Sequence, residues 1–246
     1  MIIGIIGKAG SGKDTIADFL INDHGAAKVA FADPMKRFVQ QTMGFTEEQL
    51  WGASEKRLEP HLSGQLVKTC SLCGWFGQDW PIDHDLGIQV GRCPRCGTMR
   101  AQEQPLTSRL ALQTLGTDWG RALLPDVWAR AGVNLAEAIL AGEGAKYGAR
   151  NLTARKPEVV VFSDVRFANE AAEIREAGGR VWRVERTTAK GAGGMGDSHP
   201  SEAEQDSIEA DTTIRNNATL GELRGAVRFA LTEKPELIDV EGGYAR

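Results

Sequence analysis

Short apolar runs and longer amphipathic stretches alternate along most of the chain. The apolar runs are rich in β-branched residues, which is typical of strands buried on both faces of a parallel sheet. The stretches between them repeat apolar residues at every third or fourth position, as helices do. The strands predicted in this way are the opening residues before Gly7 and residues 26–32, 157–164, 180–186 and 212–216. We therefore expect an α/β fold with a doubly wound, five-stranded parallel sheet.

One segment breaks this alternation. Residues 65–104 contain all four cysteines of the chain together with glycines and short β-like runs. Because the strand and helix pattern continues on both sides of it, we interpret this segment as a small β module inserted into one core domain. The expected organisation is a core formed by residues 1–64 and 105–246, interrupted by a module at 65–104.

The composition limits the class of protein. With 246 residues and 41% hydrophobic content, the chain can bury one substantial core. Its net charge of −4 argues against a dedicated nucleic-acid or membrane-surface protein, which leaves small molecules as the expected partners. No apolar run is long enough to span a membrane, and the chain opens on a strand rather than on a charged, cleavable leader. We expect a cytoplasmic protein.

The first predicted strand runs into a glycine-rich loop that opens a helix. Gly7, Gly12 and Lys13 follow the Gly-x-x-x-x-Gly-Lys spacing of the phosphate-binding loop. In such loops, backbone N–H groups turn onto phosphate oxygens, the lysine adds a positive charge, and the helix N-terminus faces the anion. Asp14 stands where a Ser or Thr usually places a hydroxyl on magnesium, so the sequence defines the phosphate ligands better than the metal ligands. The loop predicts ATP or GTP binding.

Ligands of an open α/β sheet bind beyond the carboxyl ends of its strands. Two further strand ends carry charged groups: Asp33, Lys36 and Arg37 after the second strand, and Asp164 and Arg166 after the third. Asp164 could hold magnesium, and Arg166 could reach a phosphoryl group during its transfer. The alternative is that Asp164 caps the following helix and pairs with a surface arginine.

Another group of polar residues lies between two stretches with helical periodicity. Arginines there suit the phosphate of a second substrate, while amide and carboxylate side chains could read a base or a sugar. The alternative is an amphipathic helix whose arginines are merely solvated and whose tryptophans lie in the core. The candidates are Arg109, Gln113, Asp118, Arg121 and Trp128.

The four cysteines form two CxxCG knuckles, Cys70 with Cys73 and Cys93 with Cys96. This spacing is typical of a tetrahedral zinc site, and a zinc ion with four cysteine ligands is structural because it keeps no open position. Disulfides are the alternative, and a reducing cytosol disfavours them. The predicted zinc ribbon could shape the second-substrate pocket, support a homodimer or touch nucleic acid. Its basic excess is small, which argues against nucleic acid.

Several segments together resemble one enzyme family, the deoxynucleoside monophosphate kinases of tailed bacteriophages. The matching segments, in order, are GKAGSGKDT, AFADPMKR, LWGASEKR, SRLALQTLGTDWGR, VVFSDVRFANEAAEI, SHPSEAE and IRNNATLGEL. The chain is similar to these enzymes over residues 1–60 and 105–230, and their loop also reads Gly-Lys-Asp-Thr. The resemblance implies a P-loop kinase fold like that of adenylate kinase, with transfer of the γ-phosphoryl of ATP to a deoxynucleoside monophosphate such as dGMP or dTMP. Mg2+ would be the cofactor, and a phage-encoded enzyme would act in the host cytoplasm.

The resemblance also implies roles for individual residues. Lys13 and Arg166 would assist phosphoryl transfer, and residues 186–209 would close as a lid that excludes water. Asn216, after the last predicted strand, is placed either to contact the adenine or to cap the final helix. The ATP phosphates would lie on Gly10, Ser11, Gly12, Lys13, Asp14 and Thr15, and the acceptor on Arg37, Arg109, Gln113, Asp118, Arg121 and Trp128.

Three other functions stay open at this point. A nucleic-acid-binding ATPase would grip DNA with the zinc ribbon, and its binding would weaken steeply with salt. A kinase acting on a modified base in DNA would also use the ribbon. The phosphomevalonate kinases of animals carry a Gly-Lys-Asp loop too, although the LQTLGTD segment favours a nucleotide acceptor.

Overall fold

The computed structural model describes residues 1–70, 72–73, 76–77, 93, 95–98, 101–150, 152, 155–186, 200–233 and 235–240. The chain divides into two compact units, the first formed by Met1–Pro34 and Gly120–Arg246 and the second by Met35–Trp119. Among the helices in the described ranges, none has the length and apolar character needed to cross a membrane.

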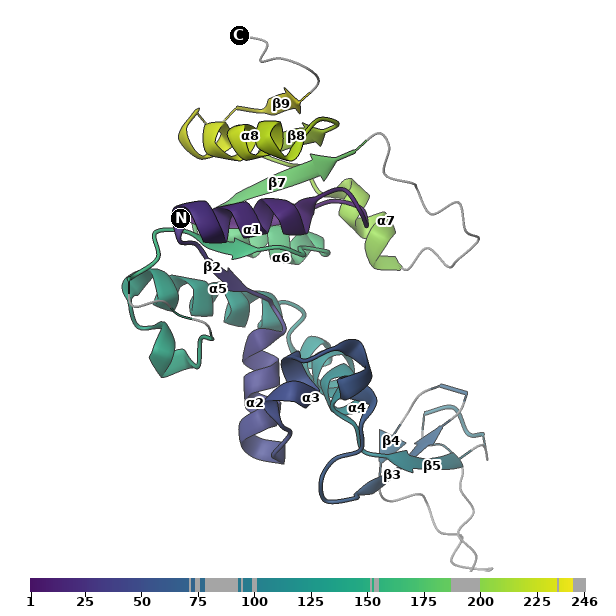
Figure 1. The fold of residues 1–246 in the computed structure, drawn as a ribbon. Helices are drawn as coiled ribbons and strands as arrows, with labels where there is room; N and C mark the ends of the chain where they lie inside the picture. The colour runs from purple at the N-terminus through teal and green to yellow at the C-terminus, as the bar shows by residue number, and fades with distance from the viewer. Residues whose placement is uncertain are drawn as a thin grey trace, which may run out of the picture. The chain divides into compact units, whose positions relative to one another are not determined.

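The first unit contains a six-stranded sheet with the strand order β2-β6-β1-β7-β8-β9. Figure 1 labels β2, β7, β8 and β9 of this sheet. Every pairing that the structure describes within this sheet is parallel, as predicted. The strands are β1 (Ile2–Ile6), β2 (Ala27–Val29), β6 (Val160–Phe162), β7 (Arg180–Glu185), β8 (Thr212–Asn216) and β9 (Leu237–Val240).

The last strand, β9, is an addition to the five predicted strands. It lies at the edge of the sheet and pairs with β8. Its sequence, LIDV, alternates exposed and buried positions because one of its faces is open to solvent. A strand of this kind lacks the continuous apolar run from which the other five were predicted.

Helices cover both faces of the sheet, which confirms the doubly wound arrangement. On β1, Ile3 and Ile5 pack in a core with α1 (Lys13–His24) and α8 (Leu220–Glu233). Ile2 and Ile6 face the other way and pack with α5 (Val127–Ala141) and α6 (Ala168–Glu176). The strands read as continuous apolar runs because both of their faces are buried. This unit also contains the 3-10 helix η3 (Gly144–Tyr147) and α7 (Pro200–Ser207).

The second unit combines short helices with a small antiparallel sheet of order β4-β3-β5. Ser108 ties two of the helices together, because its buried Oγ donates to the carbonyl oxygen of Gln49 at 2.5 Å. The sheet agrees with the predicted β insertion. The elements are α2 (Asp33–Met43, which starts in the first unit), α3 (Glu47–Trp51), η1 (Ser54–Leu58), β3 (Leu66–Cys70), β4 (Phe76–Gly77), β5 (Ala101–Pro105), α4 (Ser108–Gln113) and the π-helix η2 (Thr114–Arg121, which ends in the first unit).

Candidate active site and cysteine cluster

The predicted phosphate loop connects β1 to α1 in the first unit. Gly10 and Gly12 have backbone φ angles of 78° and 103°, which residues with a Cβ rarely adopt. The Ser11 N–H donates to the carbonyl oxygen of Lys8 at 3.1 Å and closes the turn. Because α1 begins at Lys13, directly after Gly12, the N–H groups of its first turn face the loop. This backbone is suited to holding phosphate oxygens.

Asn216 supports the loop from the end of β8. Its Nδ2 donates to the carbonyl oxygen of Ser11 at 2.8 Å, and the contact is buried. A Cβ at Gly12 would lie 2.4 Å from the same nitrogen, so the glycine is required for this close approach as well as for its φ angle. At the start of α8 it is Thr219 that exchanges hydrogen bonds with Glu222. The described contact of Asn216 is therefore with the phosphate-loop backbone.

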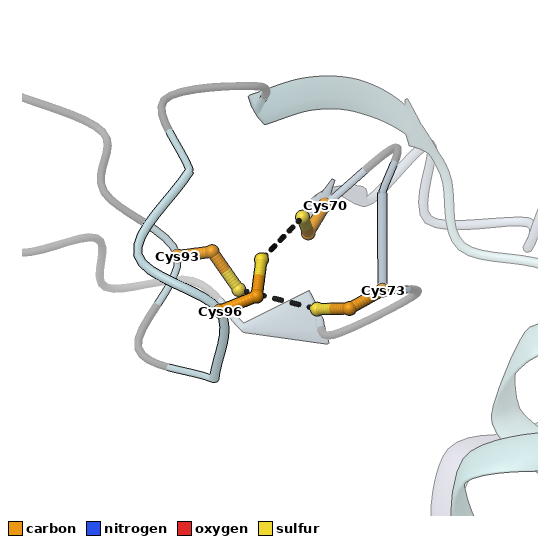
Figure 2. A group of neighbouring side chains, drawn as sticks. All are labelled: Cys70, Cys73, Cys93 and Cys96. Atoms are coloured by element: carbon orange, nitrogen blue, oxygen red, sulfur yellow. Dashed lines mark hydrogen bonds between the residues drawn. The ribbon is translucent and has the colours of Figure 1, made fainter.

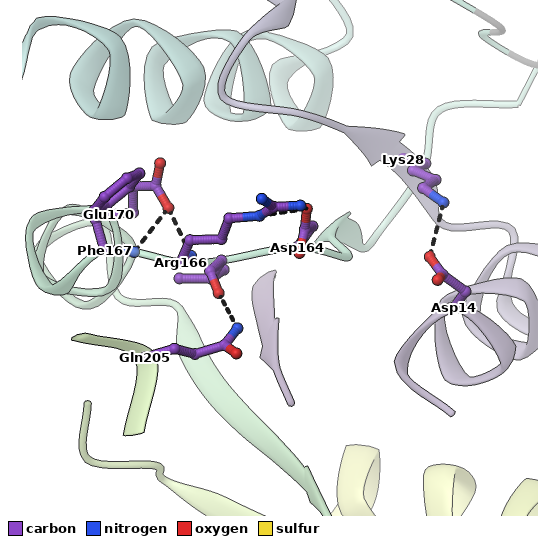
Figure 3. Close-up of polar contacts among 8 residues, drawn as sticks. Asp14, Lys28, Asp164, Arg166, Phe167, Glu170 and Gln205 are labelled. Carbon is purple, nitrogen blue, oxygen red and sulfur yellow. Dashed lines mark hydrogen bonds and ion pairs between the residues drawn. The ribbon is translucent and has the colours of Figure 1, made fainter. Parts of the chain in front are cut away.

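Two polar side chains of the loop region have contrasting surroundings. Ser11 Oγ is buried and, within the described residues, has no hydrogen-bond partner, so it is able to donate to a phosphate oxygen. Asp14 is exposed and forms an ion pair with Lys28 of β2, whose Nζ lies 3.7 Å from Asp14 Oδ1 (Figure 3). Thr15 follows on α1 and is half-buried. In this loop a carboxylate therefore occupies the position after the lysine, where the usual loop has the hydroxyl of Ser or Thr.

The loop after β6 brings Asp164 and Arg166 together (Figure 3). Arg166 donates to Asp164 Oδ2 from Nε at 2.8 Å and from Nη2 at 2.5 Å. Both side chains are exposed, so the pair contributes little to folding stability. The N-cap of α6 is Phe167, and Asp164 therefore does not cap this helix.

Two buried side chains fix the backbone of this loop. Glu170 of α6 accepts hydrogen bonds from the N–H groups of Arg166 and Phe167 at 2.8 and 3.2 Å. Gln205 of α7 donates to the carbonyl oxygen of Val165 at 2.6 Å (Figure 3). Sequence analysis missed both residues. A Glu three positions after an N-cap is a recognisable local signal, whereas the Gln205 contact joins residues 40 positions apart and has none.

Arg121 lies beside the same loop in the first unit. Its guanidinium carbon is 4.3 Å from the centre of the Phe167 ring. Burial raises the pKa of the Glu170 carboxyl, although the two N–H donors and the positive charge of Arg121 act in the opposite direction. The structure therefore places two of the predicted arginines, Arg121 and Arg166, near one loop. Trp128 of α5 belongs to the same unit and is half-buried.

The other acceptor candidates, apart from Asp33, belong to the second unit. Lys36 and Arg37 of α2 lie over the Trp51 ring, with their charged groups 5.6 and 5.1 Å from its centre. Arg109 and Gln113 are exposed on α4. Asp33 stays in the first unit, where its Oδ2 accepts from the Ala30 N–H at 2.8 Å.

Residues 114–121 form a π-helix, although their apolar spacing predicts an α-helix. Gly116 allows this segment to approach the start of α2, because a Cβ there would lie 3.1 Å from Met35 Sδ. Asp118 lies in the π-helix and accepts a hydrogen bond from Arg95 at 3.1 Å. π-Helices are rare and frequently occur at functional sites.

The four cysteine side chains converge in the second unit (Figure 2). The Sγ atoms of Cys70 and Cys96 are 3.6 Å apart, those of Cys73 and Cys93 are 3.4 Å apart, and all four lie within 4.8 Å of one another. Four sulfur atoms bound to one zinc ion at about 2.3 Å would be separated by about 3.8 Å, whereas a disulfide holds its sulfurs at about 2.05 Å. The geometry fits a shared metal ion and contains no disulfide among these four residues.

The surroundings of Cys70 favour metal binding. Burial raises the pKa of its thiol, but hydrogen bonds from the backbone N–H groups of Cys73 and Leu72 and from the Cys96 thiol outweigh that effect and lower the pKa to about 7. A lowered pKa increases the fraction of thiolate, which is the form that binds metals. The cluster is therefore compatible with Zn2+.

Most of the predicted lid, residues 187–199, lies outside the described residues. The segment that follows forms α7, which reaches the candidate site at two points. Besides the contact of Gln205 with Val165, the carboxylate of Asp206 lies 3.4 Å from Lys8 Nζ of the phosphate loop.

Comparison with known proteins shows the family. A protein of Acanthamoeba polyphaga mimivirus, a proposed deoxynucleotide monophosphate kinase, is 30% identical over 224 residues, which are 90% of this chain and 91% of that protein. The chain belongs to the deoxynucleoside monophosphate kinase family. The deoxynucleoside-5′-monophosphate kinase of Escherichia phage T5 is 27% identical over 200 residues, or 72% of each chain. No protein-family model matches the chain. The chain is thus a kinase enzyme, and the family predicted from its motifs is confirmed.

Proposed function

We propose that this kinase transfers the γ-phosphoryl group of ATP to a deoxynucleoside monophosphate, giving ADP and the deoxynucleoside diphosphate used in DNA precursor synthesis. The bond from the γ-phosphorus to its bridging oxygen breaks, and a phosphate oxygen of the acceptor forms the new bond. The main support comes from the first unit. There, a phosphate loop whose glycines have left-handed backbone conformations leads into α1, and a second loop contains Arg166. Phosphoryl transfer is catalysed mainly by positioning and by neutralising charge, which is what such residues supply.

In the donor site, the backbone N–H groups of residues 10–15, the Ser11 hydroxyl and Lys13 would hold the ATP phosphates. Asp164 would hold Mg2+, which supplies charge neutralisation when it is bound. Arg166, which contacts Asp164 in the structure, would exchange that contact for oxygens of the transferring group. Asn216 would act by supporting the loop rather than by touching the nucleotide.

For the acceptor site, we propose arginines for the phosphate and an amide and a carboxylate for the sugar or base. The fork of an arginine matches phosphate oxygens, and Gln113 and Asp118 offer hydrogen-bonding groups. We propose dGMP and dTMP as the first acceptors to test. The residues assigned to this site are Asp33, Lys36, Arg37, Arg109, Gln113, Asp118, Arg121 and Trp128.

We also propose that residues 65–104 are an inserted zinc ribbon and that residues 186–209 act as a lid over the core formed by 1–64 and 105–246. Support for the ribbon comes from the antiparallel strands β3 and β5, which begin and end the segment, and from the four converging cysteines. Support for the lid comes from α7, whose Asp206 pairs with Lys8 of the phosphate loop.

The test is a coupled assay of ADP release with Mg-ATP and each deoxynucleoside and ribonucleoside monophosphate, with Lys13→Ala as the blank. We expect ADP release that depends on one or a few deoxynucleoside monophosphates. Phosphomevalonate and single-stranded DNA are included as competing acceptors or activators. ADP release that depends on either of these alone would overturn the proposal.

A further inference from the structure

Arg95 links the cysteine cluster to the predicted acceptor segment. It lies in the second knuckle, between Cys93 and Cys96. Its Nη2 donates to Asp118 Oδ1 at 3.1 Å, and its Nη1 lies 3.5 Å from the carbonyl oxygen of Cys73 in the first knuckle. One side chain therefore contacts both the metal-binding module and the LGTD motif, which are separated by more than 20 residues in sequence.

The Arg95–Asp118 pair is poorly suited to a purely structural role. The side chains retain 47% and 31% of their exposure, and partly exposed ion pairs contribute little to folding stability. What the pair does is orient a carboxylate. Arg95 donates to Oδ1 and so restricts the rotation of the carboxyl group, which limits the directions that Oδ2 takes.

The backbone around Asp118 is unusual. Asp118 lies in the π-helix η2, a rare helix type that frequently occurs at functional sites. Gly116 contacts α2 on one side through Met35, and the Arg95 contact holds the exposed side chain of Asp118. Loss of the Arg95 contact would leave this carboxylate with several rotamers instead of one.

We propose that the zinc-bound knuckle is a positioning element for acceptor binding, with Arg95 holding Asp118 in the orientation that accepts a hydrogen bond from the deoxynucleoside monophosphate. This inference rests on the proposed function. Cys93 and Cys96 would both bind the ion, which would hold their backbone in place and so position Arg95 between them. Zinc binding and acceptor binding are therefore coupled, and each strengthens the other.

The first test compares kinetic constants of Arg95→Ala, Asp118→Asn and the double variant, each with its zinc content measured. We expect Arg95→Ala to retain about one zinc per chain, to raise the KM for the acceptor about tenfold and to leave the KM for ATP unchanged. The double variant should be no worse than Asp118→Asn alone, because both substitutions remove the same contact. Lys56→Ala, which breaks the exposed Lys56–Glu59 pair in the same unit, is the matched control and should change neither KM.

The second test uses zinc release to a chromogenic chelator, which requires no catalysis. Arg95→Ala and Asp118→Asn should release zinc faster than the wild type. Saturating dGMP or dTMP should slow release from the wild type and have no effect on Arg95→Ala. Faster zinc release from both variants would support the link between Arg95 and Asp118. If no monophosphate led to ADP formation at the same time, the proposed reaction would be rejected while the link stood. An unchanged acceptor KM in zinc-loaded Arg95→Ala, or effects that multiply in the double variant, would overturn the inference.

Discussion

Arg166 combines a fixed backbone with an adjustable side chain. Glu170 accepts a hydrogen bond from its N–H, and the neighbouring carbonyl of Val165 accepts one from Gln205. The guanidinium group contacts Asp164 in an exposed pair, which is easily exchanged for another anion. A phosphoryl group carries more negative charge than one carboxylate, so in the proposed reaction Arg166 would exchange Asp164 for the transferring group.

Arg166→Ala should therefore lower kcat by at least about 100-fold, because a guanidinium that stabilises transferring phosphoryl groups contributes at least that much. The Kd for ATP, measured by calorimetry, should stay within about twofold. Arg166→Lys should recover only part of the activity, since an ammonium lacks the planar fork. Arg155→Ala is the control: Arg155 precedes β6, whereas Arg166 follows it, and Arg155 pairs with exposed Glu158 at 3.2 Å. Equal losses in the two alanine variants would contradict the role of Arg166.

Glu170 predicts a pH dependence of stability. Its pKa is raised above the ordinary value of 4.5, chiefly by burial, so the folded protein binds this proton more tightly than the unfolded chain does. The stabilisation from the protonated form is fully present below about pH 4.5 and is lost as the pH rises through the raised pKa. Glu170→Gln keeps an acceptor for the two N–H groups and cannot ionise.

Urea denaturation of the wild type and Glu170→Gln across this pH range should show the difference. The free energy of unfolding of the wild type should fall relative to that of the variant as the pH increases above 4.5. The Glu176→Gln variant, at an exposed position of the same helix, controls for the loss of a negative charge. If the free energy of unfolding of the wild type instead rises relative to that of Glu170→Gln over this pH range, the effect of the N–H donors on the Glu170 pKa outweighs that of burial.

At the scale of elements, a buried hydrogen bond from Asn216 joins the end of β8 to the phosphate loop. Asn216→Ala would leave the buried carbonyl of Ser11 without its donor, at a cost of about 1–3 kcal/mol in the free energy of unfolding. We expect weaker ATP binding as well, since the same contact holds the loop backbone. Urea denaturation and ATP titration measure the two effects.

Thr219→Ala is the control. It removes the cap of α8, three residues after Asn216, at a cost of about 1 kcal/mol in the free energy of unfolding. That variant should lose stability and keep the ATP affinity of the wild type. If both variants weaken ATP binding equally, Asn216 has no specific function in holding the loop.

The elements that could be predicted from sequence are those with a local signal. The phosphate loop is recognised by its own glycines, and five strands are recognised as apolar runs. The edge strand β9 and the π-helix at residues 114–121 have no such signal, because solvent exposure and tertiary packing determine them. The same limit applies to Gln205 and Arg95, whose partners are distant in sequence, and to the partner of Asn216, although Asn216 itself is a candidate from the sequence.

At the scale of the whole molecule, the predicted donor and metal residues fall in different compact units. The phosphate loop, Asp164 and Arg166 belong to the first unit, and the four cysteines belong to the second. Each unit has contacts of its own that hold these residues, such as Asn216 with Ser11 in the first and Arg95 with Asp118 in the second. Motif order along the sequence predicts both sets of residues and a separate cysteine module, but it does not reveal that residues 35–64 and 105–119 cluster with that module.

This separation predicts that zinc loss and ATP binding are independent. Removal of the proposed zinc ion by a chelator, followed by separation of the chelator, should lower the unfolding temperature, because the cysteine cluster would lose the ion that joins its knuckles. A given concentration of ATP should then raise the unfolding temperature of the zinc-depleted protein as much as that of the zinc-loaded protein, since a ligand stabilises according to its own Kd. Restoring zinc and repeating the scan controls for irreversible damage. Loss of the ATP-dependent shift on depletion would mean that the zinc module also supports the phosphate loop, so that the two units act as one binding element.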